Sequence, residues 1–67
     1  MNGTVKFYNT ERGYGFIAPE TGGRDTYVHA SILAEAGIRE LTEGQKVTYE
    51  VVSGQDGRDA AANLQLA

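Results

Sequence analysis

The chain has 67 residues and a mass of 7.2 kDa, which is enough for one small domain with a thin hydrophobic core. It contains no cysteine and one histidine, which excludes disulfides, thiol catalysis and metal sites built from cysteines or several histidines. Its apolar runs are too short for a membrane span and it begins without a signal-peptide pattern, so we expect a soluble, cytoplasmic monomer with no membrane partner and no cofactor.

The net charge of −3 argues, taken alone, against a polyanionic partner such as nucleic acid. The charge is unevenly distributed, however. Residues 1–30 hold equal numbers of cations and carboxylates, and the whole acidic excess lies in residues 31–67. Five of the six aromatic residues and the histidine lie in residues 1–30. The sequence therefore predicts a neutral aromatic surface that is separate from an acidic flank.

Turn residues divide the chain into short segments in which apolar and polar residues alternate, as in β-strands. In chain order these segments predict strands at Asn2–Asn9, Tyr14–Ala18, Asp25–Ala30, Gln45–Val52 and Ala60–Leu66. Asp56-Gly57 is a hairpin signal between the last two. Because open strand edges are costly in so small a domain, we expect an all-β fold in which residues 1–67 form one small barrel that is closed or nearly closed.

Alternation within the strands also predicts which side chains share a face. The common faces are Val5 with Phe7, Val47 with Tyr49 and Val51, and Ala62 with Leu64 and Leu66. The predicted core is Val5, Ile17, Val28, Val47, Val51 and Leu64. Residues 31–43 differ, since Ser31 is a possible helix cap and Gly37 a helix stop, which predicts one or two helical turns.

Two pairs of flat side chains mark the second and third predicted strands. Tyr14 and Phe16 are two residues apart, as are Tyr27 and His29, so each pair projects from one face. If these strands are neighbours, the four rings form one patch. The alternative, that the aromatic residues fill the core, is less favoured because the opposite face already supplies apolar residues and a buried histidine needs a partner.

Flat rings bordered by cations suit a polyanion that carries flat rings of its own. Unpaired bases stack on aromatic faces, while Lys and Arg contact the phosphates. Lys6 and Arg12 supply such cations next to the predicted rings. The sequence therefore predicts binding of single-stranded nucleic acid.

The segment at residues 12–17, Arg-Gly-Tyr-Gly-Phe-Ile, resembles an RNP1-type motif, and Thr26–His29 resembles the RNP2-type element that accompanies it. Their order, and the short segment before them, do not fit an RRM domain. The chain instead resembles the cold shock domain family over nearly its whole length. That resemblance implies a five-stranded antiparallel OB-fold barrel that binds single-stranded RNA or DNA with low sequence specificity, acting as an RNA chaperone or a regulator of transcription or translation.

The resemblance also implies which residues contact the nucleic acid. They are Lys6, Phe7, Tyr8, Arg12, Tyr14, Phe16, Asp25, Tyr27 and His29, with Ile38 offering only apolar contact. The chain departs from the family pattern at Phe7 (usually Trp), at Ala30 and Ile38 (often aromatic), and in the stretch Gly57–Asn63. We therefore expect a weaker or less extended binder than the best of the family.

Catalysis and peptide binding are the two alternative functions. Catalysis is not expected, because Asp25 and His29 are too far apart on one strand to work as an acid–base pair and no nucleophile arrangement is present. A small barrel that binds peptides through its aromatic residues stays open as the alternative. It accounts less well for the cations that border the predicted patch.

Overall fold

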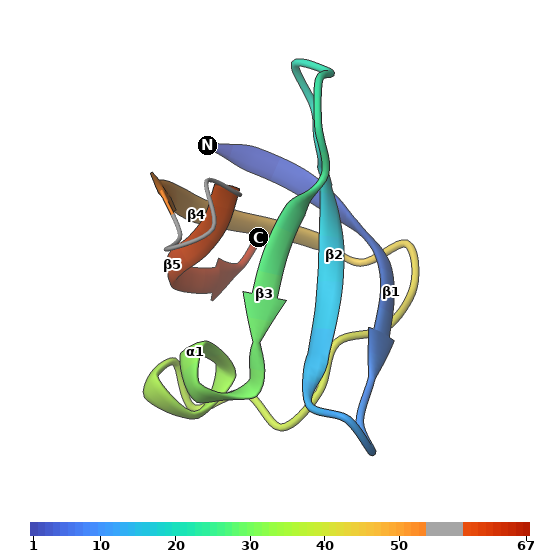
Figure 1. Cartoon of the computed structure of the whole chain (residues 1–67), viewed down its shortest axis with the longest axis vertical. Coiled ribbons are helices and arrows are strands. Elements are labelled where there is room, and N and C mark those ends of the chain that lie inside the picture. The colour runs from blue at the N-terminus through green and yellow to red at the C-terminus, as the bar shows by residue number, and fades with distance from the viewer. Residues whose placement is uncertain (54–58) are drawn as a thin grey trace.

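The computed structural model describes residues 1–53 and 59–67, and these form five strands and one short helix (Figure 1). The elements are β1 Asn2–Asn9, β2 Tyr14–Pro19, β3 Thr26–His29, α1 Ala30–Glu35, β4 Lys46–Ser53 and β5 Asp59–Leu66. Each predicted strand is confirmed to within one residue at either end. The predicted Asp56-Gly57 turn and the start of the altered stretch Gly57–Asn63 lie outside the described residues.

The strands close into a barrel in the order β1-β2-β3-β5-β4, with β1, β2 and β3 side by side in Figure 1. Four of the neighbouring pairs are antiparallel, but β3 and β5 run parallel, with Tyr27 opposite Ala60. The expected five-stranded OB-fold barrel is confirmed, and β3 with β5 is the one pair in it that is not antiparallel. Strand directions cannot alternate all the way round a closed ring of five, so one neighbouring pair must be parallel.

The interior of the barrel is apolar and small. It consists of Val5, Ile17, Val28, Leu33, Leu41, Val47, Tyr49, Ala61 and Leu64, which confirms every predicted core residue except Val51. Val51 is 39% exposed. Thr48 is the last residue of β4 that pairs with β1. Val51 lies beyond it along β4, so it has β5 as a neighbour on one side and, among the described residues, no strand on the other.

A bulge in β1 changes which of its side chains reach the core. Val5 pairs with Ile17 of β2 and Phe7 pairs with Phe16, so Lys6 has no partner in this ladder. Val5 is consequently buried, whereas Phe7 is 42% exposed on the outer face. The prediction that Val5 and Phe7 share a face was wrong for this reason.

A second bulge lies in β5. Here Tyr49 of β4 stands opposite two residues of β5, Asn63 and Leu64, and Asn63 adopts a left-handed backbone with φ of 49°. The extra residue shifts the alternation, so that Ala61 and Leu64 both face the core. The predicted common face of Ala62, Leu64 and Leu66 was therefore wrong for Ala62, which the bulge separates from Leu64, while Leu66 at the end of the strand is 50% exposed.

The helix α1 follows β3 directly and packs against the barrel through Leu33. Its end at Gly37 is confirmed, because Gly37 has φ of 75° and the backbone N–H groups of Gly37 and Ile38 donate to the carbonyls of Ala34 and Leu33. The predicted cap is corrected, since His29 occupies the N-cap position in place of Ser31. No helix among the described residues is long and apolar enough to cross a membrane.

Candidate nucleic-acid interface

Five rings form a continuous patch over β1, β2 and β3, which we call the aromatic surface. Its members are Phe7, Tyr14, Phe16, Tyr27 and His29. Phe7 lies 5.6 Å from Phe16 between ring centroids, and Phe16 lies 5.8 Å from Tyr27. Tyr14 is 6.1 Å from Phe7, from Phe16 and from Tyr27, while His29 lies 6.4 Å from Tyr27. Each ring therefore has at least one neighbour at a distance usual for aromatic pairs.

The pairing of β2 with β3 brings these rings together. Tyr14 stands opposite His29 and Phe16 opposite Tyr27, and residues directly opposite in an antiparallel pair share a face. The predicted common face of the two strands is thereby confirmed. Tyr14, Phe16 and Tyr27 are half-buried, Phe7 and His29 are exposed, and none belongs to the core. The alternative in which these rings fill the core was wrong.

Two glycines shape the strand beneath the rings. Gly13 closes the turn before β2 with φ of 74°, a backbone conformation that favours glycine. A Cβ at Gly15 would lie 2.5 Å from the carbonyl oxygen of Phe7 and 2.8 Å from Cδ1 of Tyr8. The close approach at Gly15 is thus made by β1 and the Tyr8 ring.

Two of the predicted contact residues lie away from the aromatic surface. Tyr8 and Ile38 are half-buried and pack against the hydrophobic core. Burial, together with the nearby negative charge of Glu40 and the Tyr27 side chain, raises the pKa of Tyr8 above its ordinary value of 10.0. Contact of these two side chains with nucleic acid stays a prediction.

His29 is fixed in place by the helix that follows it. Its Nδ1 accepts a hydrogen bond from the backbone N–H of Ser31 at 3.1 Å, which caps α1. Because Nδ1 accepts, the proton of the neutral ring lies on Nε2, which has no hydrogen-bond partner within residues 1–53 and 59–67. The cap therefore also orients this ring within the aromatic surface.

Cations border the aromatic surface on two sides. Lys6, displaced by the β1 bulge, donates from Nζ to Asp25 Oδ2 at 3.0 Å. Arg12 lies in the turn between β1 and β2, where the Asn9 side chain accepts from the backbone N–H groups of Glu11 and Arg12 at 3.0 and 3.1 Å. Arg12 is exposed and makes no ion pair with the residues that the structure describes.

The sequence reasoning missed two charged residues at this site. Arg24 Nη2 lies 3.8 Å from Asp59 Oδ1, and both line a hollow next to Phe16 and Tyr27. Asp59 reaches the hollow because β5 lies beside β3, a long-range pairing with no local signal. Arg24 did have a local signal in the sequence, since it is a cation directly before a predicted strand that carries aromatic residues.

Comparison with known proteins identifies the family of this chain. A sequence model of the 'Cold-shock' DNA-binding domain matches residues 1–67. The chain belongs to the cold-shock domain family. The cold shock protein CspA of Rhizobium meliloti is 49% identical over 67 residues, covering 98% of this chain and 97% of the relative. The cold shock-like protein CspE of Escherichia coli is 43% identical over 66 residues, covering 98% and 96%.

Cold-shock domains are nucleic-acid-binding modules and not enzymes, which confirms that part of the expected function. The domain also occurs inside a longer relative, the glycine-rich protein 2 of Nicotiana sylvestris, which is 47% identical over 62 residues that make up 29% of its length. The closed five-stranded barrel described above agrees with the family. The exposed rings of this cold-shock domain lie on its sheet, over β1, β2 and β3.

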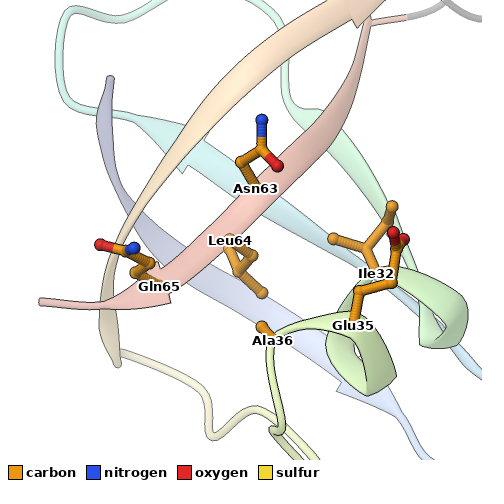
Figure 2. A pocket seen from close by; sticks show the side chains of 6 residues that line it. All are labelled: Ile32, Glu35, Ala36, Asn63, Leu64 and Gln65. Carbon is orange, nitrogen blue, oxygen red and sulfur yellow. The ribbon is translucent and has the colours of Figure 1, made fainter.

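A second hollow in this cold-shock domain lies between α1 and β5. Figure 2 shows the residues that line it, which are Ile32 and Glu35 of α1, Ala36 directly after the helix, and Asn63, Leu64 and Gln65 of β5. It holds one carboxylate among amide and apolar groups and shares no residue with the aromatic surface. Within residues 1–53 and 59–67 no three His, Asp or Glu side chains converge as metal ligands. The aromatic surface therefore remains the candidate site.

Proposed function

We propose that this cold-shock domain binds single-stranded RNA or DNA with low sequence specificity by stacking unpaired bases on the aromatic surface. One observation carries the proposal: the five rings are contiguous, lie outside the core and span three neighbouring strands. A base stacked on such a ring contributes about 1–3 kcal/mol. Every base has a flat face, so stacking tolerates many sequences.

Single strands are favoured over duplexes because stacking needs bases that are free to leave their partners. In a duplex the faces of the bases are already covered by neighbouring base pairs. A protein that holds single strands in this way opposes the formation of secondary structure. We therefore assign the domain the role of an RNA chaperone or a regulator of transcription or translation, working as a cytoplasmic monomer.

Phosphate contacts from Lys6 and Arg12 would accompany the stacking. Both side chains are exposed at the border of the aromatic surface. With a net charge of −3, long-range attraction to a polyanion is weak, so affinity rests on stacking and on local cations. Ala30 supplies no ring next to His29, and Ile38 packs on the core, so this domain should bind less tightly than relatives with rings at both positions.

The test is a titration of the protein with a pyrimidine-rich single-stranded oligonucleotide and with its duplex, followed by tyrosine fluorescence at two salt concentrations. We expect binding to the single strand alone. Its log affinity should fall with log salt by about 0.7 per phosphate contacted. Equal affinity for both forms, or none for either, would contradict the proposal. Salt-independent capture of a peptide in place of the oligonucleotide would favour a protein-interaction module.

A further inference from the structure

Two exposed ion pairs lie at one end of the aromatic surface. Lys6 Nζ is 3.0 Å from Asp25 Oδ2, with 55% and 37% of the two side chains exposed. Arg24 Nη2 is 3.8 Å from Asp59 Oδ1, with 76% and 36% exposed. Asp25, Arg24 and Asp59 line one hollow together with Phe16 and Tyr27. Each cation is therefore paired with a carboxylate. Both pairs lie close to Phe16 and Tyr27, where a base stacked on these rings would bring its phosphates.

The fold places these carboxylates there from separate parts of the chain. Arg24 and Asp25 directly precede β3, whereas Asp59 is the first residue of β5, which runs parallel to β3. Lys6 reaches Asp25 from the bulge in β1. The arrangement thus depends on the bulge and on the parallel closure of the barrel.

We propose that Asp25 and Asp59 restrain the affinity of this domain for single strands by competing with phosphate for Lys6 and Arg24. The inference rests on the proposed function. Carboxylate and phosphate oxygens are alternative acceptors for the same ammonium and guanidinium donors. A phosphate that approaches either cation meets the carboxylate already beside it, which competes for the N–H donors and repels the strand as a like charge. The acidic partners therefore lower both the affinity and the number of phosphates engaged.

Asp59 gives the cleaner test, because Asp25 is also a candidate for a hydrogen bond to a base. Asp59→Asn keeps the size of the side chain and removes its charge. Glu20→Gln is the matched control: Glu20 is exposed, begins the loop that leads to Arg24, and makes no ion pair with the described residues. It removes one negative charge without releasing a cation.

The experiment measures the affinity of the parent, Asp59→Asn and Glu20→Gln for oligo-dT at several salt concentrations. An exposed ion pair changes an equilibrium by a factor of up to about five. We expect Asp59→Asn to bind about two- to fivefold tighter than Glu20→Gln at low salt, with a log–log salt slope steeper by about 0.7. In the Asp59→Asn background, Arg24→Gln should abolish this gain, while in the parent it should change affinity little.

The outcomes separate this inference from the proposed function. If the parent binds oligo-dT but Asp59→Asn gains no more than Glu20→Gln, the competition is refuted and the single-strand function stands. A gain that survives Arg24→Gln would refute it equally, because the released guanidinium would not be its source. If the parent fails to bind single strands at all, both proposals fall. Urea unfolding of each variant confirms that the compared proteins are folded.

Discussion

Phe7 and Phe16 stand directly opposite each other on β1 and β2, with ring centroids 5.6 Å apart, because Lys6 is bulged out of the ladder between Val5 and Phe7. In a regular strand Phe7 would share a face with Val5 and point into the barrel. The bulge transfers this ring to the aromatic surface and directs Lys6 toward Asp25. One irregularity in β1 thus supplies both a stacking ring and a cation at the candidate interface.

The bulge predicts opposite phenotypes for two residues that sequence alternation would treat alike. Phe7→Ala should weaken single-strand binding by about 1–3 kcal/mol and change the free energy of unfolding little, since the ring is 42% exposed. Val5→Ala should lower the free energy of unfolding by about 2 kcal/mol, because Val5 is fully buried. Urea unfolding measures the stability of both variants, and oligonucleotide titration measures their affinity. If Phe7→Ala were as unstable as Val5→Ala, the placement of the Phe7 ring on the outer face would be refuted.

Gly15 is required for the packing of β1 on β2. Gly15→Ala introduces a Cβ about 2.5 Å from the carbonyl oxygen of Phe7, so the two strands must move apart. We expect a loss of about 1–3 kcal/mol in the free energy of unfolding, as for overpacked interiors. Urea denaturation measures this loss. Ala18→Gly is the control, because it changes another residue of β2 without adding a Cβ. Unchanged stability in Gly15→Ala would mean that the strands are less closely apposed.

Tyr49 carries a buried hydroxyl that has no hydrogen-bond partner among the described residues. A buried polar group without a partner is destabilising. Tyr49→Phe removes the hydroxyl and keeps the ring in the core, so it should raise the free energy of unfolding by about 1 kcal/mol. Thermal or urea unfolding measures the change. A loss of stability would indicate that the hydroxyl has a partner, such as an internal water.

The raised pKa of Tyr8 predicts how stability declines in alkali. The unfolded chain ionises Tyr8 near the ordinary value of 10.0, whereas the folded protein keeps the phenol neutral to higher pH, chiefly because the ring is partly buried. The resulting stabilisation is complete below pH about 10 and is lost as the pH rises through the folded pKa.

Tyr8→Phe cannot lose this contribution, so its free energy of unfolding should fall less steeply above pH 10 than that of the parent. Urea unfolding at pH 8, 10 and 11 compares the two proteins. Parallel curves over that range would show that the environment of Tyr8 does not favour the neutral phenol.

The sequence was informative wherever strands are short and regular. Tyr14, Phe16, Tyr27 and His29 could be assigned to one face because β2 and β3 have no bulge between these residues, so a period of two holds. Ile17 and Val28 were assigned to the core by the same reasoning. Resemblance to a known family then supplied the barrel type.

Features that depend on pairing between residues far apart in the sequence could not be predicted. The bulges at Lys6 and Asn63 reverse the alternation within one strand, and nothing in the local pattern marks where they occur. The ion pair between Arg24 and Asp59 depends on the parallel neighbour of β3, which only closure of the ring determines. His29 was recognised as a ring but not as a helix cap, because the boundary between β3 and α1 was not predicted at that residue.

The central claim is that flat rings at the aromatic surface bind unpaired bases. Phe16→Leu tests it most directly, since leucine stays apolar but cannot stack, and all four tyrosines remain to report binding by fluorescence. Val52→Ala, an exposed apolar position outside the aromatic surface, is the control. We predict that Phe16→Leu stays folded and binds oligo-dT at least about fivefold more weakly than the parent, while Val52→Ala binds equally well. A folded Phe16→Leu protein with parental affinity would contradict the account.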